Sequence, residues 1–276
     1  MSGENFDICE IRMPTQLEKA KTFRALHEAP GIFVIPNPWD AGSSRILTAV
    51  GFKALATTSA GHAHAMGRLD GVGAVSREEA LANAKAICDA THLPVNGDLE
   101  NLYAHAPDAA AATVPLAAAA GLVGCSIEDA TCEDGNPIYD LDISIARVKA
   151  AVAAARALPF PFTLTARAEN FLHGRKDIDD TIRRLQTYEA AGADVLYAPG
   201  LNDIALVRQV MAAVTKPVNV IVSNASAHFT VAELGAAGVK RISVGSALAR
   251  TALGGFLTAA REIAEQGTFS YGKTTP

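Results

Sequence analysis

The chain has 276 residues, of which 49% are hydrophobic and 19% charged, and its formal net charge is −5. This composition is typical of a folded globular protein and excludes disordered and fibrous classes. The mild acidic balance, without a run of Lys and Arg, argues against nucleic acid or a membrane surface as a partner.

The first residues, "MSGENFDICEIRMP", lack the basic start and the apolar core of a signal peptide. No apolar run approaches the ~20 residues that cross a bilayer. Cys9, Cys88, Cys125 and Cys132 form no CxxC pair. We therefore expect reduced thiols and a cytoplasmic protein.

Short apolar runs alternate with Ala-rich helical patterns along the chain. Strands are predicted at 32–36, 53–58, 94–98, 122–127, 162–167, 194–198, 217–222 and 240–244. Helices are predicted at 40–50, 76–91, 108–120, 142–157, 177–191, 202–213, 230–236 and 246–265. Several of these helices end in a glycine, which is a typical stop. Strands that are apolar throughout indicate a parallel sheet covered by helices.

Eight strand–helix units predict an α/β protein with a (β/α)₈ barrel. The alternative is a doubly wound open sheet, which the absence of a GxGxxG after the first strand disfavours. We predict one domain over residues 1–276, with the barrel at about 31–266. A helix at about 15–28 precedes the barrel, and the tail after Gln266 is expected to be loose.

Polar residues gather where the predicted strands end. Asp98 and Glu100 lie two residues apart after a buried strand and would point the same way. The other polar or small residues at these ends are Thr58, Ser59, Ala60, Gly61, His62, Asp70, Tyr103, His105, Glu128, Asp129, Arg167, Glu169, Asn170, Ser223 and Asn224. Active sites of such barrels lie at this end, so we expect these side chains to converge.

The acids of this set predict a site for a divalent cation. Asp98, Glu100 and Glu128, with Asp70 nearby, offer only oxygen ligands, which favour Mg²⁺ or Mn²⁺ over zinc. Arg167 would supply a fork for a substrate carboxylate or oxyanion. The alternatives are structural: an acid can cap a helix, and Arg167 can simply pair with Glu128.

Four segments resemble motifs of the isocitrate lyase/phosphoenolpyruvate mutase superfamily. "NGDLENLY" is similar to its Asp-x-Asp-x-Gly-Tyr-Gly magnesium motif, and "CSIEDA" to its Ile-Glu-Asp on strand 4. "LTARAEN" resembles its Ala-Arg on strand 5, and "TTSAGHAHAMGRLDG" its Ser and later Asp after strand 2. The matches follow the family order from residue 31 to about residue 260.

The resemblance implies roles for these residues. Asp98 would ligate Mg²⁺, with Glu100 and Glu128 around its water shell and Asp70 close by as a catalytic residue. The backbone amides of Ser59, Ala60 and Gly61, together with catalytic Arg167, would bind the substrate. Family members act on 2-oxo or 2-hydroxy acids through a metal-chelated pyruvate enolate, so we expect a Mg²⁺-dependent lyase or decarboxylase of a small dicarboxylic acid.

The departures from the family keep other functions open. Glu100 replaces the second Asp of the magnesium motif, and Leu102 and Ala104 replace its glycines. The loop "ATCEDGNPIYD" lacks both the Lys-Lys-Cys-Gly-His of the lyases and the Lys-Thr-Asn-Ser-like loop of phosphonate enzymes. Cys132 is therefore not expected to be the general acid. The alternatives are C–P chemistry on a phosphonopyruvate-like substrate, of the phosphonomutase or carboxyvinyl-carboxyphosphonate phosphorylmutase type, and a carboxylate-binding barrel without turnover.

The last predicted helix, 246–266, is more apolar than one stripe against its own barrel requires. Its apolar residues are Ala247, Leu248, Leu253, Phe256, Leu257 and Ile263. A surplus apolar face usually marks an interface, and the resemblance implies a helix exchanged between subunits. We expect a homodimer or homotetramer.

Overall fold

The computed structural model describes residues 13–133, 135–223, 226 and 228–273. Its eight parallel strands form one sheet in the order β1-β8-β7-β6-β5-β4-β3-β2. They are β1 (Phe33–Ile35), β2 (Leu55–Ala56), β3 (Val95–Gly97), β4 (Gly124–Glu128), β5 (Thr163–Arg167), β6 (Val195–Tyr197), β7 (Val218–Ile221) and β8 (Arg241–Ser243). Seven of them lie inside a predicted strand, β4 extends one residue beyond the predicted 122–127, and the predicted (β/α)₈ barrel is confirmed. Cys9 and Asn224 lie outside the described residues.

The barrel is nearly closed. β1 pairs with β8 and β2 with β3. The seam between β1 and β2 is bridged by a hydrogen bond from the Ala56 amide to the Pro36 carbonyl (3.0 Å). Asn37 strengthens the seam, because its Nδ2 donates to the Thr57 carbonyl (2.8 Å) and its Oδ1 accepts from the amides of 244–245 (2.9 Å each).

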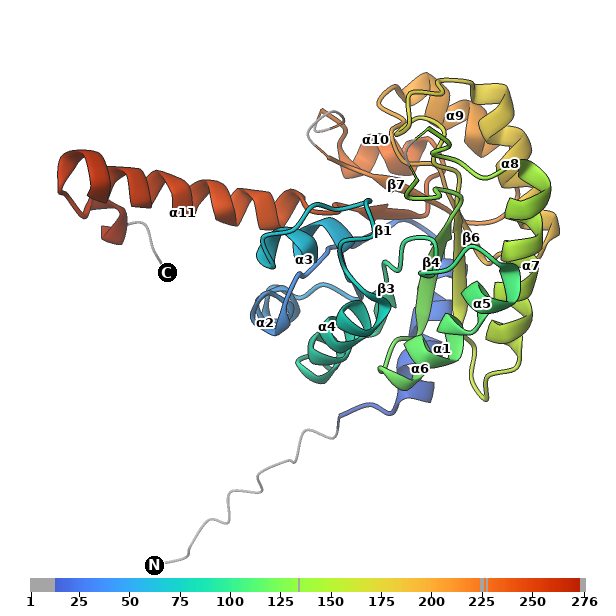
Figure 1. The fold of residues 1–276 in the computed structure, drawn as a ribbon, viewed down its shortest axis with the longest axis horizontal. Helices are drawn as coiled ribbons and strands as arrows, with labels where there is room; N and C mark the ends of the chain where they lie inside the picture. Colours follow the sequence, from blue (N-terminus) through green and yellow to red (C-terminus); the bar gives the residue numbers. More distant parts are fainter. Residues whose placement is uncertain (1–12, 134, 224–225, 227, 274–276) are drawn as a thin grey trace, which may run out of the picture.

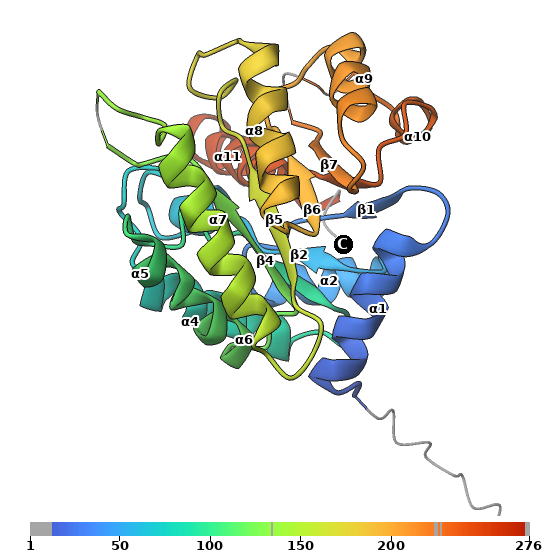
Figure 2. The ribbon, with the colours of Figure 1, turned by 90° about the vertical axis from the view of Figure 1, so that its right-hand side faces the viewer.

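Helices surround the sheet (Figures 1 and 2). They are α1 (Gln16–Glu28), α2 (Ala41–Val50), α3 (Ser59–Ala65), α4 (Arg77–Asp89), α5 (Pro107–Ala111), α6 (Thr113–Ala119), α7 (Leu141–Arg156), α8 (Ile178–Ala190), α9 (Ile204–Ala213), α10 (Val231–Ala236) and α11 (Ala247–Gln266). The glycine stops are confirmed at residues 51, 121, 192 and 238, where φ is 98°, 97°, 99° and 91°. Only glycine adopts this left-handed backbone at little cost.

Two helix predictions were wrong. The single helix expected at 108–120 is divided into α5 and α6, because Pro115 has no N–H and its ring clashes with the carbonyl four residues earlier. The segment after β2, where no helix was predicted, begins with α3, whose Thr58 cap accepts from the Gly61 amide (3.1 Å).

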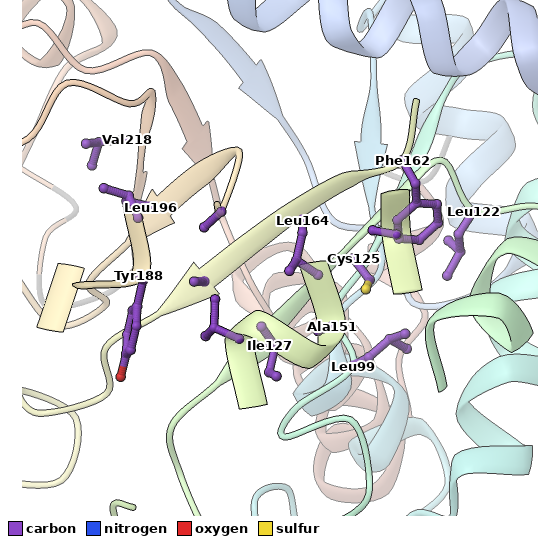
Figure 3. Packing of buried hydrophobic residues seen from close by; sticks show 14 of the residues in the cluster. Leu99, Leu122, Cys125, Ile127, Ala151, Phe162, Leu164, Tyr188, Leu196 and Val218 are labelled. Atoms are coloured by element: carbon purple, nitrogen blue, oxygen red, sulfur yellow. The ribbon is translucent and has the colours of Figure 1, made fainter. Parts of the chain in front are cut away.

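The core lies between the sheet and the helices. Figure 3 shows Ile127 and Leu164 of adjacent strands packing with Ala151 of α7 and Tyr188 of α8. The inner face of the barrel differs from the prediction of strands that are apolar throughout. Its buried polar side chains include Asn96, Ser126, Thr165, Asn219 and Arg241. A strand turns alternate residues to opposite faces, so these residues line the interior while their neighbours meet the helices.

The two ends of the described chain behave differently. α1 confirms the predicted N-terminal helix and buries Ala20 and Phe23. α11 projects away from the barrel and buries only Ala249 (Figure 1). The expectation of a loose tail after Gln266 was wrong for residues 267–273, because Ser270 donates from its amide and its hydroxyl to Glu262. None of the described helices is long and apolar enough to cross a membrane.

Candidate active site

A cavity of about 250 Å³ opens at the carboxyl ends of the strands. Ser59, Ala60, Asp70, Asp98 and Arg167 line it, and so do residues earlier on the strands, namely Asn96, Ser126, Thr165, Asn219 and Arg241. A second cavity of about 230 Å³ lies near α1 at the amino ends. We place the site in the first cavity, because barrel active sites lie at the carboxyl ends and because two of the predicted acids, Asp70 and Asp98, line it.

Arg167 is surrounded by three carboxylates. Its Nη1 lies 2.7 Å from Asp98 Oδ1, its Nη2 lies 3.2 Å from Glu128 Oε2, and its Nε lies 2.7 Å from Glu169 Oε1. Burial alone would lower the pKa of Arg167, but the three acids outweigh it and raise that pKa well above its usual value. Arg167 therefore carries a fixed positive charge in a defined orientation.

Asp98 is held from several sides. The amide and hydroxyl of Ser59 donate to its Oδ2 at 3.0 and 3.1 Å. The Ser126 hydroxyl donates to its Oδ1 at 3.3 Å, and the Asp98 amide donates to Thr57 Oγ1 at 2.8 Å. The negative charge of Asp98 is thus balanced by Arg167 and further stabilised by hydroxyl and amide donors.

Asp70 and Glu100 extend the negative charge beside Asp98. Asp70 is exposed at the rim of the cavity, and partial desolvation there, followed by the Asp98 charge, raises its pKa. Burial, followed by the charges of Asp70 and Asp98, raises the pKa of Glu100 to about 7. Because Arg167 does not neutralise the whole cluster, a cation placed there would be stabilised.

The donor set fits Mg²⁺ or Mn²⁺. Among the described residues, no group of three or more His, Cys, Asp or Glu side chains is placed to hold a metal ion. Mg²⁺ usually takes one or two carboxylates and keeps several waters, so Asp98 with water-mediated neighbours suffices. Glu128 packs behind Arg167, in a small space bordered by Arg147 and Tyr188. The ligand roles of Asp98, Glu100 and Glu128 remain predictions.

The three amides predicted to bind substrate have different partners. The Ser59 amide donates to Asp98 and the Gly61 amide to Thr58 Oγ1. Ala60 lines the cavity, and its amide has no acceptor among the described residues. Ala60 is therefore the amide best placed to meet a ligand, and the substrate-binding role of this segment remains a prediction.

Asp129 does not join the cluster at the cavity. It is buried in the helix layer, where Tyr188 Oη and Arg184 Nη1 donate to its Oδ2 at 2.7 and 3.0 Å. The Glu169 amide donates to its Oδ1 at 2.8 Å. Asp129 therefore positions the strand end that carries Glu169, whereas its neighbour Glu128 contacts Arg167, although both acids border the same small space beneath α7 and α8.

The loop after β3 has an unusual backbone. Glu100, Leu102 and Tyr103 have φ values of 48°, 60° and 59°, in the left-handed region that favours glycine. Leu102 occupies the position at which the magnesium motif of the superfamily has a glycine. Arg147, which is buried, donates to three carbonyls of the 101–105 segment and holds this conformation.

Cys132 lies beside the acid cluster. Its Sγ is 3.8 Å from Glu100 Oε2. Burial, together with the charges of Glu100 and Glu128, raises the pKa of the Cys132 thiol to about 12. The thiol is therefore protonated and acts here as a weak hydrogen-bond donor.

The polar residues inside the barrel were not predicted from the sequence. The cavity is lined by Asn96, Thr165, Asn219 and Arg241, which precede the strand ends. The signal was present in "PVNG", "TLTAR" and "PVNVI", where a polar residue interrupts an apolar run at an inward position. Tyr197 was also missed, and its ring lies 5.0 Å from the Arg167 guanidinium carbon.

Comparisons with known proteins agree with this geometry. Residues 23–264 match the family profile described as phosphoenolpyruvate phosphomutase. A crystal structure of a putative lyase/mutase from Burkholderia cenocepacia J2315 is 54% identical, with a TM-score of 0.92 over 95% of this chain and 93% of that one. The structure of an oxaloacetate acetylhydrolase with the product oxalate is 26% identical, with a TM-score of 0.84 over 94% of this chain and 89% of that one.

Two curated relatives show the same likeness. An uncharacterized protein of Mycobacterium tuberculosis is 32% identical over 88% of this chain and 89% of the relative. A probable 2-methylisocitrate lyase 2 of Corynebacterium glutamicum is 29% identical over 72% of this chain and 65% of the relative. The chain therefore belongs to the phosphoenolpyruvate phosphomutase family, within the isocitrate lyase/phosphoenolpyruvate mutase superfamily of lyases and mutases.

Proposed function

We propose that the chain is a Mg²⁺-dependent lyase that cleaves a C–C bond of a small 2-oxo or 2-hydroxy dicarboxylic acid and leaves a pyruvate-like enolate. The observation that carries the proposal is the cluster of Asp70, Asp98 and Glu100 beside Arg167, at the cavity of a barrel of this family. The likeness to an oxaloacetate acetylhydrolase and to a probable 2-methylisocitrate lyase motivates the choice of C–C chemistry, while the family profile, named for a phosphomutase, keeps C–P chemistry as the alternative.

Asp98, Glu100 and Glu128 would hold the Mg²⁺ ion, which supplies Lewis acidity when bound. Glu128 and Glu169 orient Arg167 independently of Asp98. With Asp98 engaged by the ion, an N–H group of Arg167 would be available to the oxygen on which negative charge develops, and such fixed donors stabilise a transition state more than a ground state.

Proton transfer needs a group that holds a proton near the cavity. Asp70 lines the cavity, and partial desolvation there, followed by the Asp98 charge, raises its pKa, so it would hold a proton more readily than a free carboxyl. The Ala60 amide would orient the substrate carboxylate. In this proposal Asp70 transfers the proton and the Ala60 amide orients the substrate. The altered loop after β4 would determine which substrate fits the cavity.

The experiment is a screen of 2-oxo and 2-hydroxy dicarboxylic acids with Mg²⁺, read by pyruvate formation. We expect turnover of at least one acid, loss of that turnover in Asp98→Ala, and no loss in Asp142→Ala, an exposed control on α7. Circular dichroism would verify that both variants fold. Full activity in excess EDTA would contradict the proposal.

The same screen includes phosphonopyruvate, with release of inorganic phosphate as the readout. Turnover of phosphonopyruvate alone would replace the proposal with C–P chemistry. Binding of oxalate with Mg²⁺ but no turnover of any acid would indicate a barrel that binds carboxylates without catalysis.

A further inference from the structure

A second arginine lies deeper in the same cavity. Arg241 is the first residue of β8, is 3% exposed, and lines the cavity together with Arg167. Its Nη2 donates to Thr165 Oγ1 at 3.1 Å, and Thr165 precedes Arg167 by two residues on β5. Two residues of a strand span roughly 6.6 Å, so the Arg241 guanidinium lies about one layer below that of Arg167.

The other contacts of Arg241 are also neutral. Its Nε donates to Asn219 Oδ1 at 2.8 Å, and its Nη1 lies 3.3 Å from His27 Nε2. His27 Nδ1 is 2.8 Å from the Phe23 carbonyl and must donate to it, which leaves Nε2 to accept from Arg241. Burial, followed by the Arg241 charge, lowers the pKa of His27 to about 3, so the imidazole is uncharged.

The two arginines of the cavity differ in charge balance. Arg167 contacts three carboxylates, whereas Arg241 contacts none among the described residues. Burial without a counter-ion lowers the pKa of Arg241 to about 10. A buried charge is normally paired. The guanidinium has five N–H donors, and the three contacts occupy one on each nitrogen, so Nη1 and Nη2 each keep one N–H for another partner.

Asn96 lines the same part of the cavity but does not offer a free acceptor to a ligand. It is 5% exposed, and its Oδ1 has no hydrogen-bond partner among the described residues, yet this atom is covered and lies beside Gly124 of the neighbouring strand. The unpaired group of the inner cavity is therefore the Arg241 guanidinium, whose charge an anionic ligand could balance.

We propose that Arg241 is an anion-binding residue at the inner end of the cavity and takes the second carboxylate of the dicarboxylic acid substrate. The 2-oxo or 2-hydroxy acid end then lies at Arg167 and the acid cluster. The identity of the ligand rests on the proposed function, whereas the anion site itself does not. Arg241 would in this way set the preference for dicarboxylic over monocarboxylic acids.

The decisive variant is Asn219→Asp, which is nearly isosteric and gives Arg241 an internal counter-ion. Asn219 Nδ2 donates to Ser243 Oγ at 2.9 Å, and a carboxylate there can accept from that hydroxyl instead. The fold should therefore survive, as melting curves would verify. Gln209→Glu, exposed on α9, is the control that adds one negative charge elsewhere.

Titration calorimetry with Mg²⁺ compares two probes. Oxalate carries only the oxo-acid end, and racemic malate adds the second carboxylate. We expect Asn219→Asp to weaken malate binding roughly tenfold to a hundredfold, the range for a charged hydrogen bond, and to affect oxalate much less. Arg241→Gln should do the same where it folds. Equal weakening of both probes, or none, would overturn the proposal.

A metal-free measurement separates the two proposals. If the wild type binds neither probe with Mg²⁺, the proposed function fails, but Arg241 can still be tested with inorganic phosphate in EDTA. We expect phosphate to raise the melting temperature of the wild type and of Gln209→Glu, but not of Asn219→Asp. The absence of a phosphate effect in the wild type, or an equal effect in Asn219→Asp, would overturn the anion site.

Discussion

Arg167 organises the mouth of the cavity because each of its nitrogens contacts a different carboxylate. A lysine would keep the charge but present a single point that cannot contact three acids at once. We expect Arg167→Lys to lower kcat by a factor of ~10² or more, since the lost interaction serves the transition state. Steady-state kinetics would measure it, with Arg183→Lys on the surface of α8 as the control.

An unchanged kcat with a raised KM would contradict this expectation and make Arg167 a binding residue only. The distinction matters for the three surrounding acids as well. If Arg167 serves the transition state, Glu128 and Glu169 act through it as positioning residues.

Cys132 should be dispensable for the chemistry. Its thiol is protonated, contacts Glu100 weakly at 3.8 Å, and lacks the Gly-His neighbours of the lyase loop. We expect Cys132→Ser to keep most of the activity, because a hydroxyl replaces one weak donor with another. Initial rates at saturating substrate would measure it. A loss of several orders of magnitude would restore the reading of Cys132 as a general acid.

Glu100 makes the stability of the metal-free protein depend on pH. Its folded pKa of about 7 lies above the usual value of 4.5, so the folded state holds a proton that the unfolded state has released. Stability is therefore lost as pH rises from about 4.5 to about 7. In EDTA we expect the melting temperature of the wild type to fall as the pH rises from about 4.5 to about 7. In Glu100→Gln the same pH change should lower the melting temperature less.

Addition of Mg²⁺ at pH 7.5 should recover part of the lost melting temperature in the wild type, because the ion stabilises the ionised cluster. Asp70 also has a raised pKa, so it contributes with the same sign. A melting temperature that rises with pH over this window would show that the cluster is already neutralised.

The loop after β3 carries the metal-binding prediction, and a single side chain from α7 supports it. Arg147 is 1% exposed, donates to three carbonyls of the 101–105 segment, and stacks over Tyr139 at 4.4 Å. Arg147→Met would leave those carbonyls buried without donors. We expect it to lower the free energy of unfolding by about 3 kcal/mol.

Urea denaturation would measure the loss, with Arg183→Met as the control. Arg183 is largely exposed and pairs with Asp180 on the surface, where such a pair contributes about 1 kcal/mol or less. Equal losses in the two variants would show that the left-handed backbone at Leu102 and Tyr103 does not depend on Arg147.

The order of the elements could be predicted because it follows from periodicity and glycine stops, which are local. α3 could not, since "SAGHAHA" is short and its helix depends on the Thr58 cap and on packing against Trp39 and Ala249, near Gly61. The sequence suggested that the polar residues at the strand ends form one set, yet Asp129 contacts Arg184 of α8 whereas Glu128 contacts Arg167 of β5. That difference is set by strand register.

Arg241 and Asn219 show why part of the site could not be predicted. Each is a single polar residue in an apolar strand, and their partners Thr165 and His27 are far away in sequence. A sequence pattern does not indicate whether such a residue faces a cavity, a helix or an ion pair. The charge imbalance that carries the inference becomes visible only when the interior of the barrel is assembled.

Helix α11 exposes more apolar surface than a helix of a monomeric protein normally does. α11 leaves the barrel after β8 and buries only Ala249 (Figure 1). Its exposed apolar side chains are Leu248, Leu253, Phe256, Leu257 and Ile263, and Phe256 is 71% exposed. On α2, Ile46 and Val50 are also exposed, at 66% and 67%. Two unpaired apolar faces on one chain are suited to meet each other across a dimer.

We therefore predict a homodimer or homotetramer in which α11 of one subunit packs on the barrel of another. Gly254 and Gly255 have no side chains, and a Cβ added at either would meet nothing within 4 Å. Another subunit could therefore approach the backbone of α11 closely at these two residues. Light scattering at micromolar concentration should give a multiple of 28.7 kDa. Phe256→Asp should shift the mass toward the monomer because it would bury a charge in the interface, whereas Gln209→Glu on α9 should not. A mass of 28.7 kDa for the wild type would rule the oligomer out.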